Sequence, residues 1–200
     1  NFLIELDEGL KNEISSHLFP LVIHPYTQEE NGINCDDHSS SGEARFNEEL
    51  AEQIAGINLD MTNFSDKGQT PIEPCDVLYT DAKNLFFIHN KIFRSSSALS
   101  HLFNQGYVSA RVYTKEQAAK ERLKLLIAQK SKEELKDRYN MVLDQNPQTI
   151  ILFGIIERKN AKKEHTLQTL PLFSKISLTN VLRGMKDLRV KTAIRFIPRQ

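Results

Sequence analysis

One segment of nine residues, Leu85 to Phe93, most constrains the fold of this chain. Alternate residues of a β-strand point to opposite faces of the sheet. One face of this segment would carry Leu85, Phe87, His89, Lys91 and Phe93, and the other would carry Phe86, Ile88, Asn90 and Ile92. Because both faces are mostly apolar, we expect a central strand that is covered on both sides.

Hydrophobic periodicity and capping residues predict the elements around this strand. We expect helices over residues 2–18, 42–55, 115–129, 132–145 and 177–188, a further helix after Ser95, and strands over residues 21–23, 57–64, 75–80, 85–93, 149–156 and 190–197. Residues 27–42, rich in Asn, Asp and Ser, predict a loop. Ser131 and Glu134 have the spacing of a capping box at the start of the helix over 132–145.

The order of these elements predicts the topology. It is helix, three strands in a meander, helix, strand, helix, strand, with the helical pair over 115–145 inserted before the fourth strand. Strands joined through a long helical connection pair in parallel by a right-handed crossover. The predicted class is therefore α/β, or α+β with a mixed sheet, in one domain over residues 42–200. Residues 1–41 begin in an apolar-periodic stretch without methionine, so we expect them to join a further N-terminal region.

Composition excludes several classes of protein. A formal net charge of zero gives no overall attraction to nucleic acid or membrane, so any basic surface must be local. The longest strongly apolar run, Ile150 to Ile156, is far shorter than the ~20 residues that span a bilayer. Cys35 and Cys75 lack the spacing of a disulfide framework or a zinc site. We therefore expect a cytoplasmic protein without a membrane partner, and nothing here indicates its oligomeric state.

The strongest candidate site lies on two neighbouring strands. Asp76 lies on one strand, and His89 and Lys91 on the next strand point the same way because they are two residues apart. A carboxylate in such a site helps to hold Mg²⁺ or Mn²⁺ against a phosphate, while the lysine stabilises negative charge or orients the attacking water. Glu43, at the start of the preceding helix, is the natural fourth contributor and, with Asp76, the expected metal ligand.

This arrangement resembles the PD-(D/E)XK nuclease superfamily, whose core order is helix, three strands, helix, strand. The resemblance covers roughly residues 42–156. It implies a restriction-endonuclease-like core with an inserted helical pair and an additional C-terminal helix and strand. His89 stands where that pattern has Asp or Glu. Because a neutral imidazole is a poorer ligand for Mg²⁺ than a carboxylate, the alternative of an inactive site stays open.

Several short blocks along the chain form a second pattern. They are Glu43 to Asn47, Leu59 and Asp60, Cys75 to Leu78, Ile88 to Lys91, Ser96 to Gly106, and Leu170 to Ser174. Together they resemble the C-terminal half of a family of uncharacterised, sporadically distributed bacterial proteins. A patchy distribution is typical of mobile defence or restriction genes, so the resemblance implies a defence-associated role.

The helix after Ser95 offers candidates for binding nucleic acid. Ser96 and Ser97 lie at its N-terminus, where free N–H and hydroxyl groups can cradle a phosphate, and His101 and Gln105 follow on the same stripe. The alternative is that the serines only cap the helix and His101 is solvated. Four basic residues in the run 157–163 could follow a nucleic-acid backbone, although such runs are more often solvated loops. They are Arg158, Lys159, Lys162 and Lys163.

These observations lead to two hypotheses about function. The first is a metal-dependent nuclease that hydrolyses DNA or RNA in a bacterial defence or restriction context, with Asp76, His89, Lys91 and Glu43 as its catalytic residues. The second is a catalytically inactive nuclease-like fold that binds nucleic acid or a partner protein, including the chain's own N-terminal region.

Overall fold

The computed structural model describes residues 41–65, 68, 70–81, 83–157 and 166–197. Their centre is a five-stranded sheet in the order β1-β2-β3-β4-β5. The elements are α2 (Ser41–Gln53), β1 (Ile57–Asn58), β2 (Val77–Thr80), β3 (Asn84–Ile92), α3 (Ser96–Lys115), α4 (Gln117–Lys130), α5 (Glu133–Asp144), β4 (Gln148–Ile156), η1 (Leu167–Thr169), α6 (Leu172–Asp187) and β5 (Lys191–Ile197). The helix, strand and loop expected within residues 1–40 lie outside the described residues.

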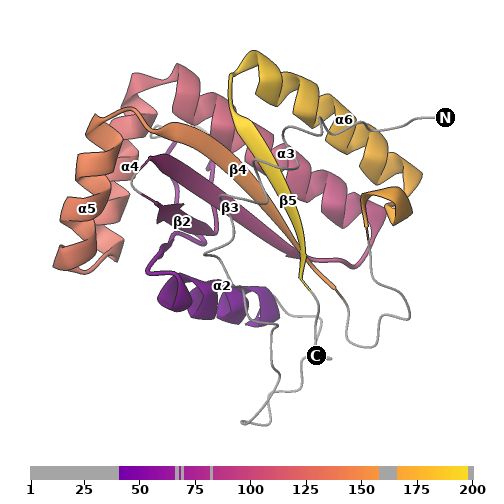
Figure 1. Cartoon of the computed structure of the whole chain (residues 1–200), viewed down its shortest axis with the longest axis horizontal. Helices are drawn as coiled ribbons and strands as arrows, with labels where there is room; N and C mark the ends of the chain where they lie inside the picture. Colours follow the sequence, from indigo (N-terminus) through magenta and orange to yellow (C-terminus); the bar gives the residue numbers. More distant parts are fainter. Residues whose placement is uncertain (1–40, 66–67, 69, 82, 158–165, 198–200) are drawn as a thin grey trace, which may run out of the picture.

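β3 occupies the centre of the sheet, as its two apolar faces predict. It pairs antiparallel with β2 and parallel with β4, and β4 pairs in parallel with β5. Leu85 and Phe87 belong to one apolar core, whereas Phe86 and Ile88 belong to another on the opposite face. α2 packs over the second core and α3 to α6 cover the first (Figure 1). The predicted α/β class, element order and mixed sheet are confirmed.

α3 begins directly after a serine that caps its N-terminus. Ser95 Oγ accepts a hydrogen bond from the backbone N–H of Ala98 at 3.2 Å. The helix buries an apolar stripe, whose members are Leu99, Leu102, Phe103, Gly106 and Ala110. A Cβ on Gly106 would lie 2.5 Å from the Phe153 ring, so glycine lets the helix lie directly on β4.

The strand expected over residues 57–64 is wrong beyond Asn58. Only Ile57 and Asn58 pair with β2. The Asn58 side chain then accepts a hydrogen bond from the backbone N–H of Asp60 at 3.0 Å, and Met61 adopts a left-handed backbone with φ of 59°. Local side-chain bonds of this kind compete with strand pairing. The chain therefore turns away from the sheet directly after β1.

Two helix starts also differ from expectation. α5 begins after Lys132 without a side-chain cap, and the Ser131 hydroxyl instead donates to the carbonyl of Ile127 at 2.6 Å in the last turn of α4. The predicted capping box is therefore wrong. α6 begins at Leu172 rather than at residue 177, because Pro171 can stand before the first turn without losing a helical hydrogen bond.

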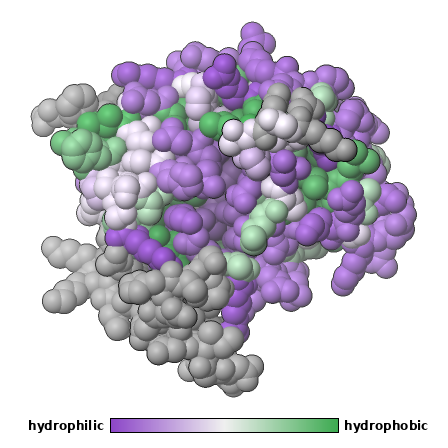
Figure 2. Space-filling view, turned by 180° about the vertical axis from the view of Figure 1, so that it is seen from behind, coloured by the Kyte–Doolittle hydropathy of each residue, from purple (hydrophilic) through white to green (hydrophobic). Residues whose placement is uncertain are grey.

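The surface is predominantly hydrophilic on the face seen in Figure 2, where hydrophobic residues form small separate patches. Within the described part of the chain, no helix has the length and apolar character needed to cross a membrane.

Candidate functional site

Three carboxylates meet beside the start of β2. Oxygens of Asp60, Glu73 and Asp76 lie within 4.8 Å of one another, and all three side chains are partly buried. The backbone of Asp76 is held on both sides, because its N–H donates to Ile88 O at 3.0 Å and its carbonyl accepts from Leu59 N at 2.8 Å. These bonds place the turn after β1 against the start of β2, so Asp60 lies next to Asp76.

A buried pair of amides connects this cluster to α2 and β3. Asn47, which is 1% exposed, donates from Nδ2 to Asp60 Oδ2 at 3.3 Å. Its Oδ1 accepts from Asn90 Nδ2 at 2.9 Å. Asn90 is 3% exposed. Because both amides are buried, they hold the Asp60 carboxylate in a defined position.

The cluster concentrates negative charge where water is scarce. Burial raises the pKa of Asp76 to about 7, and the charges of Asp60 and Glu73 add to the rise, against the N–H of Asn90 that donates to Asp76 Oδ2 at 2.6 Å. Burial, and then Asp60, raises the pKa of Glu73 as well. A divalent cation would relieve this repulsion, and an all-oxygen donor set suits hard ions such as Mg²⁺ and Mn²⁺. The residues present therefore fit a metal ion.

Lys91 forms an ion pair with Glu43 near the cluster. Its Nζ is 2.6 Å from Glu43 Oε2, and Glu43 Oε1 accepts from the backbone N–H of Ile92 at 3.2 Å. The Lys91 charge also lowers the pKa of both Asp76 and Glu73, so the ammonium lies in the field of the cluster. The structure thus brings Asp76, Lys91 and Glu43 together. Glu43 stands outside the group of three carboxylates, and its role as a metal ligand stays a prediction.

His89 is nearly enclosed, on the face of β3 that carries Leu85 and Phe87. It is 3% exposed, its ring centroid is 6.3 Å from that of Phe153, and burial lowers its pKa to about 3. The imidazole is therefore neutral at physiological pH. Its Nε2 has no hydrogen-bond partner in the part of the chain that the structure describes. His89 is not part of the carboxylate cluster. It would therefore not act as a ligand of a metal ion held by the three carboxylates, and its catalytic role stays a prediction.

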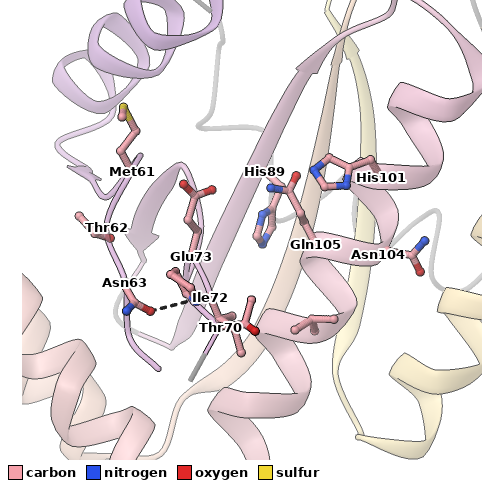
Figure 3. Close-up of a pocket in the computed structure, with 12 residues that line it drawn as sticks. Met61, Thr62, Asn63, Thr70, Ile72, Glu73, His89, His101, Asn104 and Gln105 are labelled. Atoms are coloured by element: carbon pink, nitrogen blue, oxygen red, sulfur yellow. Dashed lines mark hydrogen bonds between the residues drawn. The ribbon is translucent and has the colours of Figure 1, made fainter. Parts of the chain in front are cut away.

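A cavity of about 600 Å³ adjoins the cluster. Figure 3 shows it between the segments around Thr62 and Ile72 on one side and α3 on the other, with His89 in its wall. The Asn63 side chain accepts from Ile72 N at 3.0 Å, which joins the first two segments. Glu73 lines this cavity and also belongs to the carboxylate cluster, so the two share a wall.

The residues of α3 that were predicted to bind nucleic acid separate into two groups. Ser96 Oγ lies 2.8 Å from Ser174 Oγ of α6, and Ser97 Oγ lies 2.8 Å from the capping hydroxyl of Ser95. These contacts support the interpretation of the serines as helix and packing residues. His101 and Gln105 line the cavity instead. The basic residues expected after β4, namely Arg158, Lys159, Lys162 and Lys163, lie outside the described residues.

Comparison with known proteins adds a family. The model of a family of unknown function, DUF6119, matches residues 1–198. The chain belongs to DUF6119. No curated protein and no solved structure matches it. Of the resemblances expected from the sequence, this match supports one, the membership of a family of uncharacterised proteins.

Sequence reasoning about this DUF6119 chain missed Asp60 and Glu73 as members of the site. Glu73 could have been found, because it precedes Asp76 by three residues in a short segment between two strands. Asp60 carries no such signal. It joins the cluster only because β1 ends after two residues and the chain then turns beside Asp76.

Proposed function

We propose that the chain is a metal-dependent phosphodiesterase that hydrolyses DNA or RNA, in a bacterial defence or restriction setting. The observation that carries the proposal is the cluster of Asp60, Glu73 and Asp76 in the field of Lys91. The element order from α2 to β4 supports it further, because it is the order of a nuclease-like core. The metal would be Mg²⁺ or Mn²⁺, held by the three carboxylates.

The chemistry required is the attack of water on phosphorus. A bond from the water oxygen to phosphorus forms, the phosphorus–oxygen ester bond breaks, and the proton released by water balances the one gained by the leaving hydroxyl. When bound, the metal ion supplies charge neutralisation and Lewis acidity. Lys91 stabilises the extra negative charge on the phosphate, and Glu43 orients the lysine at 2.6 Å.

The cluster offsets the presence of an imidazole at residue 89. A nuclease of the expected pattern has a carboxylate at this position, and His89 is a neutral, enclosed group. Asp60 and Glu73 supply the negative charge that His89 does not, since their oxygens lie within 4.8 Å of Asp76. The site therefore keeps enough carboxylates for a divalent ion.

The test is cleavage of plasmid, single-stranded DNA and RNA in Mg²⁺ and in Mn²⁺. Glu73→Gln and Lys91→Met are each expected to reduce the cleavage rate by about a hundredfold or more. Lys83→Met is the control, because this exposed lysine lies just before the opposite end of β3. Equal rates in the wild type, Glu73→Gln and Lys91→Met would contradict the proposal.

A second candidate is an inactive nuclease-like fold that binds nucleic acid or a partner protein. The observation that favours it is the close pair of Lys91 and Glu43, whose side chains are 31% and 14% exposed, because this pair neutralises the only predicted catalytic cation. Such a protein would bind nucleic acid with steep salt dependence and without a metal requirement. Binding that is unchanged by EDTA, without cleavage, would support this candidate over the first.

A further inference from the structure

The cavity beside the carboxylates has the size of a small-molecule site but an unusual chemistry. Its volume of about 600 Å³ is within the range of ordinary ligand pockets. Neutral hydrogen-bonding groups line it at Asn63, Asn104 and Gln105, and apolar groups line it at Ile72 and Val108. None of the described residues in its lining is lysine or arginine. It therefore suits a flat, uncharged, hydrogen-bonding group better than a phosphate.

His89 provides an independent indication that a ligand belongs there. His89 is only 3% exposed, and its Nε2 has no hydrogen-bond partner in the described part of the chain. Leaving a buried polar atom unpaired costs free energy, so such atoms are usually paired with protein, water or a ligand. Figure 3 shows the imidazole in the cavity wall, with Glu73 on one side and Gln105 on the other.

A molecule that occupies both the cavity and the cluster must have two different parts, because Glu73 belongs to both places. Glu73 lines the cavity and contributes an oxygen to the cluster with Asp60 and Asp76. The cavity takes a neutral polar group, whereas the cluster suits a cation that attracts phosphate. A nucleotide has these two parts next to each other, as its base and its phosphate. The segment that forms the shared wall is held in place by Ser109 of α3, whose hydroxyl donates to the carbonyl of Pro74.

We propose that the cavity lined by His89 and Gln105 receives an unpaired nucleobase, so that the neighbouring carboxylates act on single-stranded or locally unpaired nucleic acid. This inference rests on the proposed function, because it assigns the substrate of the same site. The imidazole Nε2 and the amide of Gln105 meet the edge of the base, and Ile72 and Val108 pack against its plane. A base inside a duplex cannot enter without leaving the stack, so duplex substrates are disfavoured.

Binding without chemistry tests the cavity by itself. Metal-free protein is titrated with adenosine, guanosine, cytidine and uridine, which lack phosphate, and binding is followed by NMR. Val108→Trp fills the cavity from α3, and Leu125→Trp is the matched control on α4, since both residues are exposed, at 41% and 61%. We expect at least one nucleoside to bind the wild type and Leu125→Trp alike, and to bind Val108→Trp about tenfold or more weakly. Absence of nucleoside binding, or equal binding to Val108→Trp, overturns the inference.

A second variant tests the hydrogen bond to the base. His89→Phe removes Nε2 and keeps an aromatic ring, and circular dichroism with thermal melting establishes that it is folded. The folded variant should bind the nucleoside about fivefold or more weakly than the wild type, as expected for a lost hydrogen bond in a buried place. Should His89→Phe fail to fold, Val108→Trp alone decides the question.

Oligonucleotides separate this inference from the proposed function. In Mn²⁺, the wild type should cleave a single-stranded oligonucleotide about tenfold or more faster than the same sequence as a duplex, and Val108→Trp should lose that preference. Cleavage that is equal on both substrates and unaffected by Val108→Trp overturns the base cavity and leaves the nuclease. Nucleoside binding that Val108→Trp weakens, without cleavage in any metal, supports the cavity and overturns the nuclease.

Discussion

An aspartate flanks each end of β2, Asp76 before it and Asp81 after it. Hydrogen-bond donors surround the carboxylate of Asp81, whereas other carboxylates lie beside that of Asp76. At the turn into β3, Asp81 accepts hydrogen bonds from the backbone N–H groups of Lys83 and Asn84 at 3.1 and 2.8 Å. The Asn84 side chain adds contacts at 3.1 and 3.0 Å. This carboxylate is well supplied with donors, and all of them lie within three residues along the chain. It completes a turn.

Asp76, at the other end, is surrounded by groups that resemble it. It accepts the N–H of Asn90 at 2.6 Å, but it also faces the carboxylates of Asp60 and Glu73. Burial, and then the like charges of Asp60 and Glu73, raise the pKa of Asp76. A carboxylate with local donors is therefore a structural group, whereas one that meets other carboxylates retains a need for positive charge. The second kind marks a candidate site.

The largest expected effect tests that difference directly. Asp76→Asn should weaken Mn²⁺ binding by more than about a hundredfold, because it removes one of the three carboxylates that could hold the ion. Asp81→Asn should leave Mn²⁺ binding unchanged, because this carboxylate lies at the opposite end of the strand. Isothermal titration calorimetry with both variants measures the two affinities. Equal losses in the two variants would remove the distinction between the ends of β2.

The stability of the folded chain should depend on pH through Asp76. The pKa of Asp76 rises from an ordinary 3.8 to about 7 on folding, so the folded chain holds this proton more tightly than the unfolded chain. Stability of the metal-free protein therefore falls as pH rises between these values, by about 1 to 4 kcal/mol. Asp76→Asn should abolish that loss and should be more stable than the wild type at pH 8.

Thermal melting in EDTA at pH 5 and pH 8 measures this effect, with Asp81→Asn as the control. The control should keep the pH dependence of the wild type. A variant Asp76→Asn whose melting temperature changes with pH as much as that of the wild type would show that Asp76 is not the group responsible.

A change at a distance tests whether the amide pair positions the cluster. In Gly154→Ala the new Cβ would collide with Asn90 Oδ1, and Asn90 holds Asn47, which donates to Asp60. We expect a loss of about 1 to 3 kcal/mol in stability and a several-fold loss in Mn²⁺ affinity. Gly184→Ala is the matched control, because its Cβ would instead meet the Tyr107 ring. It should lose stability without losing Mn²⁺ affinity.

The smallest expected effect concerns the structural end of the strand. Asp81→Ala removes the acceptor for the N–H groups of Lys83 and Asn84, and should cost about 1 kcal/mol in the free energy of unfolding. Mn²⁺ affinity and cleavage should be unchanged. Urea denaturation measures the stability. A loss of metal affinity in this variant would show that the two ends of β2 are coupled.

The elements that sequence reasoning located well have strong local patterns. β3 was found because both of its faces are apolar, and α3 because its buried residues recur at helical spacing after Ser95. The errors fall where one side-chain hydrogen bond decides the outcome. Asn58 ends β1 by bonding the backbone ahead of it, and Ser131 bonds back into α4 instead of capping α5. Such bonds compete closely with regular structure, so pattern alone does not predict them.

The candidate site was predicted in part. Sequence reasoning could group Asp76, Lys91 and Glu43, because Asp76 and Lys91 lie on adjacent predicted strands and Glu43 starts the helix before them. The structure brings these three together. The same reasoning placed His89 with them, although it lies in the wall of the neighbouring cavity. It could not include Asp60, whose place depends on the turn after β1.

Local patterning alone thus specifies the central strand and the helices beside it, because apolar periodicity acts over a few residues at a time. The order and length of the connections specify the direction in which the strands run. Tertiary structure decides which charged groups share a space. The carboxylates of Asp60, Glu73 and Asp76 come together only when β1 pairs with β2 and α3 holds the segment before β2. Repulsion among them is unfavourable in itself, and it persists because the apolar contacts of the two cores stabilise the whole sheet.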